Sequence, residues 1–220
     1  MRALLLALTA ADAMFTATYH DLLAAVPRPM PLTSPLPMAY GSPLTDAHKA
    51  ARPPCAAGVR TSDSLFAAPA TADERAARRA VLASVWLGLG LLDECHALVA
   101  PESYAGSDGA YLHALLHRRE GPHVGEVSMT GFDNSRYWFG VLGDHDAFPS
   151  VRDAAAATPA SSPLARAFLD GLGDAWDPFA FVALCEAAAG ADDDAAADYC
   201  RAVQQAEWAL LHERIAARLT

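Results

Sequence analysis

Apolar side chains recur at spacings of three and four residues through most of the chain after residue 71, and this spacing limits the possible folds. Val81, Val85 and Leu89 repeat in this way, and residues 199–210 show the same pattern. A period near 3.6 residues places such side chains on one side of an α-helix. Convincing strand-type alternation occurs nowhere. We therefore expect an all-α protein, an irregular multi-helix bundle built from helical hairpins.

Capping and helix-breaking residues indicate where the expected helices begin and end. Residues 71–74, Thr-Ala-Asp-Glu, match the capping-box pattern that starts a helix. The helix that follows should span residues 73–99, and Gly88 and Gly90 in its middle indicate close helix packing or a bend. Further helices are expected at 108–120, 133–142, 150–157, 163–171, 177–190 and 192–219.

The first 70 residues differ from the rest. Residues 1–26 have a helical pattern, although a short apolar stretch followed by small residues also allows an exported protein with a signal peptide. Eight prolines between residues 27 and 54 remove too many backbone donors for a regular element, so we expect an extended arm or a partly disordered loop. The chain is accordingly divided into residues 1–70, a helix and a proline-rich arm, and residues 71–220, an all-helical domain.

The acidic composition argues against several classes of partner. Asp and Glu outnumber Lys and Arg 26 to 16, which gives a formal net charge of −10. Nucleic-acid binding needs a clustered basic face, so it is not expected. The sequence contains no uncharged apolar run of about 18 residues, so we expect no membrane span. The four cysteines lack CxxC pairing, which is typical of reduced thiols and favours a cytoplasmic location.

A group of histidines and carboxylates in the middle of the sequence is the strongest candidate for a functional site. His113, His117 and Glu120 follow one another at i, i+4 and i+7, so a helix places them on one face. Asp93 and His96 share a face of the preceding helix, and antiparallel packing of the two helices would bring both faces together. Such a group could bind a divalent metal such as Zn²⁺ or Fe²⁺. The possible ligands are Asp93, His96, His113, His117, Glu120 and His145.

The same residues also allow chemistry without a metal. His96, His113 or His117 could act as general acid or base, with Glu120 orienting an imidazole. Arg118 or Arg119 could hold the carboxylate or phosphate of a small anionic molecule. The structural alternative is that the arginines belong to a solvated network of ion pairs, which contributes little stability. Asn134, Tyr137 and Trp138 follow in the next helix. Trp138 by itself is more typical of a core position, but beside the nearby histidines the three together are expected to form the wall of a substrate pocket.

The order of these motifs resembles an uncharacterised family of bacterial and fungal sequences that has no established activity. The resemblance rests on an Asp-x-x-His motif at 93–96, a His-x-x-x-His-Arg-Arg-Glu-Gly motif at 113–121 and an Asp-Asn-x-x-Tyr-Trp-Phe motif at 133–139. Residues 176–186 and 207–211 resemble the C-terminal half of the same family. The chain departs from the family by about ten extra residues before Asp133 and by Cys95, where the family has a small hydroxyl residue. The resemblance implies where the site lies and not what it does.

Two functions remain open at this point. The first is a metal-dependent or acid–base enzyme that acts on a small anionic molecule. The second is a non-enzymatic helical scaffold whose polar cluster is structural and whose proline-rich arm binds a partner. The helical pair at 108–142 is similar to a tetratricopeptide unit, which is an interaction module, but one such unit cannot form the continuous core of a solenoid.

Overall fold

The computed structural model describes residues 16–35, 38–39, 45–57, 59, 65–66, 70–124, 128–191 and 193–219. Over these ranges the chain forms ten α-helices and no strand, which confirms the all-α prediction. The α-helices are α1 (Ala17–Ala24), α2 (Asp46–Ala51), α3 (Ala72–Leu89), α4 (Leu92–Val99), α5 (Asp108–Glu120), α6 (Gly131–Leu142), α7 (Phe148–Ala157), α8 (Pro163–Gly171), α9 (Pro178–Gly190) and α10 (Asp194–Ala217). Two 3₁₀ turns, η2 (Pro54–Ala56) and η4 (Ala100–Glu102), follow α2 and α4.

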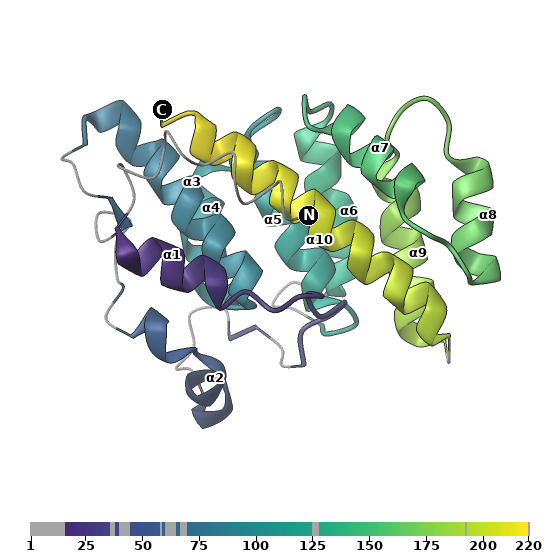
Figure 1. Ribbon diagram of the computed structural model, residues 1–220, viewed down its shortest axis with the longest axis horizontal. Helices are drawn as coiled ribbons and strands as arrows, with labels where there is room; N and C mark the ends of the chain where they lie inside the picture. Colours follow the sequence, from purple (N-terminus) through teal and green to yellow (C-terminus); the bar gives the residue numbers. More distant parts are fainter. Residues whose placement is uncertain are drawn as a thin grey trace.

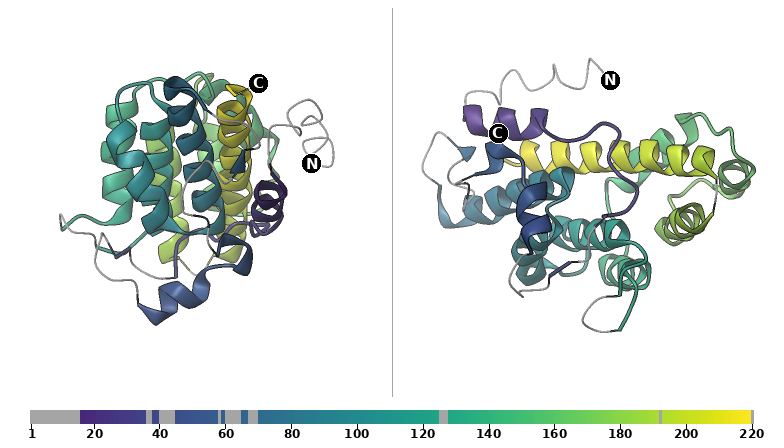
Figure 2. Two further views of the ribbon diagram at one scale, coloured as in Figure 1. Left: turned by 90° about the vertical axis from the view of Figure 1, so that its left-hand side faces the viewer. Right: turned by 90° about the horizontal axis from the view of Figure 1, so that it is seen from below.

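The helices are arranged as a row of neighbours with one long helix across it (Figure 1). Along the row α3, α4, α5, α6 and α9 each pack against the next, and α8 packs against α9. Helix α10 crosses the row and contacts α3, α7, α8 and α9. Helix α1 lies beside the C-terminal half of α10 (Figure 2). This arrangement places α5 in the interior, between α4 and α6.

The long helix expected at 73–99 is divided into α3 and α4 at Gly90. This glycine has φ of 77° and ends α3 in the left-handed conformation, which other residues rarely adopt. Gly88 has a different role, because a Cβ there would lie 2.7 Å from the Trp208 ring. The two glycines thus provide both the bend and the close helix packing that the sequence indicated.

Capping residues explain the observed helix starts. The capping box of α3 is present, with the Thr71 side chain bonded to the Glu74 backbone and the Glu74 side chain to the Thr71 backbone. Ser107 caps α5, because its side chain accepts a hydrogen bond from the Ala110 backbone. Helix α6 begins two residues earlier than expected, because Thr130 accepts a hydrogen bond from the Asp133 backbone and so acts as its cap.

The described part of the proline-rich segment contains an α-helix that was not expected. Helix α2 forms over Asp46–Ala51, between the prolines rather than through them, and the Thr45 side chain caps it. Residues further back in the arm pack against the helical body: Met30 is fully buried, and the Gln204 side chain donates to the Pro31 carbonyl at 3.0 Å. Met30, Leu32 and Met38 of the arm therefore belong to the same hydrophobic core as α3, α5 and α10, whereas no residue of α2 is buried.

Three further predictions concern a helix or signal peptide in residues 1–26, the lack of a membrane span and the state of the cysteines. Residues 1–15, which decide between a first helix and a signal peptide, lie outside the described residues, and the expected helix is seen only over Ala17–Ala24. Among the described residues no helix has the length and apolar character needed to cross a membrane. All four cysteines are free thiols, and Cys95, Cys185 and Cys200 are buried.

Candidate metal centre

Three histidines from two neighbouring helices lie together and form what we call the imidazole cluster. Helix α4 contributes His96, and α5 contributes His113 and His117 from successive turns. One potential ligand atom from each histidine lies within 4.8 Å of the other two. In a tetrahedral zinc site the ligand nitrogens are about 3.3 Å apart, because each Zn–N bond is about 2.0–2.1 Å long. Modest rotation of the side chains would therefore be needed for the rings to share one ion.

The helix that carries two of these histidines has no solvent-facing side. All 13 residues of α5, from Asp108 to Glu120, are buried. A buried polar group costs stability unless it has a hydrogen-bond partner, so each polar side chain of α5 should meet one inside the protein. The partners of these side chains consequently show what each residue does.

His113 has one ring nitrogen with a partner and one without. Its Nδ1 lies 2.9 Å from Ser103 Oγ, and the same hydroxyl donates its only proton to the Val99 carbonyl at 2.8 Å. The hydroxyl must then accept from His113, which places the imidazole proton on Nδ1. His113 Nε2 is left with its lone pair, is buried and has no hydrogen-bond partner. This lone pair is directed at no protein donor, which is the state that a metal ligand requires.

Burial also keeps His113 uncharged. Desolvation lowers the pKa of His113 to about 2, and the neighbouring His117 and His96 lower it as well. The ring therefore remains neutral over the whole physiological range, and the neutral imidazole is the form that binds metals. The ring packs face to face on the Trp138 indole, with centroids 3.8 Å apart, so its orientation is fixed.

His117 is oriented by a carboxylate, in the manner of many metal-ligating histidines. Its Nδ1 lies 2.8 Å from Glu120 Oε2, and both side chains are 1% exposed. A carboxylate in this position favours the tautomer with the proton on Nδ1 and leaves Nε2 to bind a metal. The Asn134 amide nitrogen lies 3.1 Å from His117 Nε2 in the structure, so metal binding there would replace a hydrogen bond from Asn134. Glu120 thus orients a histidine rather than extending the ligand set.

Arg118 has a different environment from the one expected of a substrate-binding residue. Its guanidinium is fully buried, forms an ion pair with Glu207 of α10 and lies over the Phe181 ring with its Cζ 4.8 Å from the ring centroid. Tyr111 donates to the other oxygen of Glu207 at 2.8 Å. Arg118 therefore links α5 to α10 through a buried network and does not face the imidazole cluster.

Arg119 points in a third direction, toward the turn between α3 and α4. It is 3% exposed and donates through Nη1 to the Leu87 carbonyl, while its Nε is buried and has no partner. Desolvation lowers the pKa of Arg119 to about 10, so the group still carries a positive charge near neutral pH. Arg119 is therefore not part of the solvated ion-pair network that was the structural alternative: among the described residues, Glu120 contacts His117 and Glu94 contacts Arg52.

Two of the possible metal ligands lie apart from the imidazole cluster. Asp93 is directed toward the proline-rich arm, where its carboxylate accepts from the Ala39 backbone at 2.8 Å. His145 Nε2 lies 3.1 Å from Asp108 Oδ1 at the opposite end of α5 from Glu120. Their sequence spacing gave no information on these contacts, because each depends on a segment distant along the chain. Of the residues that were expected to form a pocket wall, Trp138 packs on the His113 ring, whereas Tyr137 is 57% exposed.

Sequence reasoning missed the residue that fixes the His113 tautomer. Ser103 lies ten positions before His113, just after the 3₁₀ turn η4, and belongs to no helical pattern with it. Pro101 marks the end of α4 and so indicates a turn there, but the direction of the serine hydroxyl depends on the fold. The Glu207 partner of Arg118 was missed for the same reason, since 89 residues separate the pair.

Comparison of the chain with models of protein families, with curated protein sequences and with solved structures gives no significant match.

Proposed function

We propose that the protein binds a divalent transition metal through His96, His113 and His117, and that the bound metal acts on a small molecule. The observation that carries the proposal is the buried Nε2 of His113, which has a lone pair and no partner, beside two other imidazoles. Leaving a buried acceptor without a partner costs about 1–3 kcal/mol, and a metal at this position would remove that cost. If the cluster were purely structural, nothing would offset the cost of leaving the Nε2 of His113 unpaired.

Zn²⁺ is the ion that fits this set of ligands best, and Fe²⁺ is the alternative. Three neutral imidazoles are common ligands of catalytic zinc, which keeps a fourth position for water or substrate. Zinc held in this way lowers the pKa of its water to about 7 and so supplies a nucleophile near neutral pH. A hydrolytic reaction on a small molecule is therefore the activity that we propose. The resemblance to a family with the same ordered histidines remains a prediction.

The scaffold alternative has less support from the contacts. A proline-rich arm that recruits a partner should present its side chains to solvent, and Pro27, Pro29 and Pro31 are exposed. Met30 and Leu32 between them are nevertheless buried against the helical body, which fixes this part of the arm in place. The stacking of His113 on Trp138 does not distinguish the two functions, because it would stabilise a metal site and a structural core alike. The arm therefore contributes to the core, and the imidazole cluster is the stronger candidate for the functional part of the molecule.

The first test is a zinc titration of chelator-treated full-length protein, followed by competition with a chromophoric chelator. We expect one zinc ion per chain, and His113→Ala should weaken binding by more than the roughly 10–100-fold that is typical of losing an outer-shell partner. His20→Ala is the matched control, because it removes an exposed imidazole. Circular dichroism checks that each variant is folded. Absence of Zn²⁺ and Fe²⁺ binding to the wild type, or unchanged affinity in folded His113→Ala, would disprove the proposal.

A further inference from the structure

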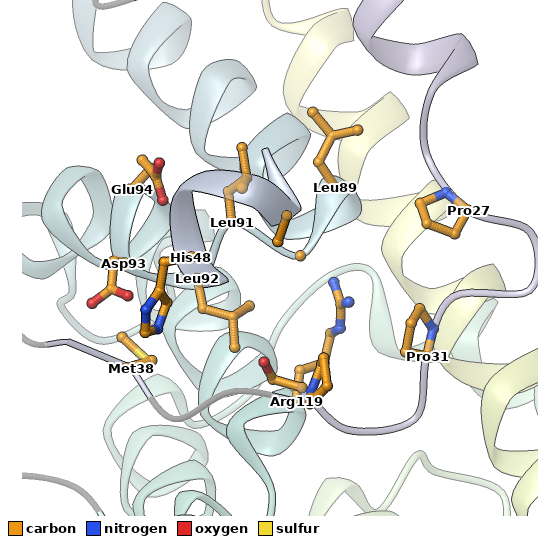
Figure 3. A pocket seen from close by; sticks show the side chains of 14 residues that line it. Pro27, Pro31, Met38, His48, Leu89, Leu91, Leu92, Asp93, Glu94 and Arg119 are labelled. Carbon is orange, nitrogen blue, oxygen red and sulfur yellow. The ribbon is translucent and has the colours of Figure 1, made fainter. Parts of the chain in front are cut away.

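A cleft of about 180 Å³ lies between the proline-rich arm and the turn that joins α3 to α4 (Figure 3). None of the three clustered histidines is among the residues that line it. Its walls are largely apolar and include Pro27, Pro31, Met38, Leu89 and Leu92. The cleft has room for several non-hydrogen atoms, since one water molecule takes up about 30 Å³ in the liquid.

Arg119 brings a positive charge into this apolar space. Figure 3 shows its side chain rising from α5, between Pro31 and the turn at Leu89 and Leu91. Nη1 is bonded to the Leu87 carbonyl, but Nε is buried without a partner, and Arg119 is in none of the ion pairs found among the described residues. A guanidinium normally uses its planar fork of donors to hold a carboxylate or phosphate. Here the edge that contains Nε has no such group.

The other charged residues of the cleft are already engaged and limit what can bind. Glu94 is paired with Arg52, and Asp93 accepts a hydrogen bond from the Ala39 backbone. Both carboxylates would repel a ligand that carries several negative charges more strongly than a ligand that carries one. A singly charged ligand with an apolar body therefore suits the cleft better than a phosphate dianion.

We infer that this cleft binds a small monocarboxylate with an apolar chain, whose carboxylate pairs with the Arg119 guanidinium and whose chain contacts the prolines and leucines. The carboxylate would complete the hydrogen bonding of Nε and neutralise a charge that is otherwise buried alone. Apolar burial along the chain would supply the rest of the affinity. The site stands apart from the metal proposal, because the clustered histidines do not line the cleft. Either proposal can therefore fail without the other.

The test uses hexanoate and inorganic phosphate as probes on the full chain, with binding measured by isothermal titration calorimetry after metal removal. We expect hexanoate to bind more tightly than phosphate. Arg119→Met should weaken hexanoate binding at least about tenfold, the effect expected for a lost charge-assisted contact. Arg166→Met is the matched control, since Arg166 is an exposed arginine on α8. In the wild type, the ¹⁵N resonance of the Arg119 Nε should shift during the titration.

A second variant covers the possibility that Arg119→Met does not fold. Ala51→Trp adds bulk at the α2 wall, where residue 51 is exposed, and should weaken hexanoate binding while Arg119 stays in place. His113→Ala should leave hexanoate binding unchanged. The proposal is overturned if the wild type binds no hexanoate, if phosphate binds as tightly, or if folded Arg119→Met binds hexanoate normally. Loss of binding in His113→Ala alone would place the anion at the imidazole cluster and would also overturn it.

Discussion

Two buried histidines, His113 and His212, have opposite hydrogen-bonding environments. His212 of α10 has a partner at both ring nitrogens: Tyr19 Oη lies 2.8 Å from Nε2, and Ser84 Oγ lies 2.6 Å from Nδ1. His113 has a partner at Nδ1 alone. Both side chains are nearly inaccessible, with exposures of 6% and 2%. Burial alone therefore does not distinguish the two residues, whereas the hydrogen bonds do.

The difference separates a structural polar network from a candidate binding site. Around α10, polar side chains connect distant segments: His212 joins α10 to α1 and α3, and Glu207 joins α10 to Tyr111 and Arg118 of α5. Removing one member of such a network leaves its partners buried and unpaired, so the main consequence should be lost stability. Removing a member of the imidazole cluster should instead affect metal binding.

The largest loss of stability is expected for Glu207→Gln. This change removes the negative charge that pairs with the fully buried Arg118, and breaking a buried ion pair in this way costs about 3–5 kcal/mol. Urea denaturation measures the free energy of unfolding. Glu186→Gln is the matched control, because Glu186 pairs with Arg136 at the surface, and such pairs contribute about 0–1 kcal/mol. Equal effects of the two substitutions would show that the α10 network is not the structural element we describe.

His212 should make stability depend on pH. Desolvation lowers its pKa from 6.5 in the unfolded chain to about 4 in the folded protein. Between these values the unfolded state binds more protons, so His212 contributes stability above about pH 6.5 that is lost as pH falls toward 4. The loss should reach roughly 3 kcal/mol, because one pKa unit corresponds to about 1.4 kcal/mol.

The measurement compares wild type with His212→Gln by urea denaturation from pH 7.5 to 4. The difference in unfolding free energy between the two proteins should shrink as the pH falls, because only the wild type must keep this imidazole neutral. His20→Gln is the control for an exposed histidine. A constant difference across this range would contradict the assignment of His212 as a buried neutral ring.

The sequence was most informative where neighbouring residues determine the structure. The capping box at Thr71, the break near Gly90 and the helical faces of α5 all depend on interactions within a few residues. Among the described residues, the short α-helix α2 was missed, and it lies in a segment where proline content suggested irregular structure. Proline restricts only its own position and the residue before it, so the proline-free residues 44–52 could still form the six-residue helix α2.

For the candidate site, the sequence indicated which histidines gather but not what else they contact. The i, i+4 spacing of His113 and His117 determines their common face, and an antiparallel neighbour was sufficient to add His96. Asp93 and Arg118 were assigned to the same site because they are close in sequence. Their side chains instead contact the proline-rich arm and α10, which are 54 and 89 residues away. Such long-range contacts leave no periodic signal in a single sequence.

Ser103→Ala should have the smallest effect on folding and is the most direct test of the His113 tautomer. The change removes the acceptor for the Nδ1 proton and should cost about 1 kcal/mol of stability. Zinc affinity should fall about tenfold, the lower end of the range for an outer-shell partner, because the ring loses its fixed orientation and tautomer. Ser161→Ala, which removes an exposed hydroxyl, is the control. Wild-type zinc affinity in Ser103→Ala, together with lost affinity in His113→Ala, would leave His113 as a ligand but show that the serine does not prepare it.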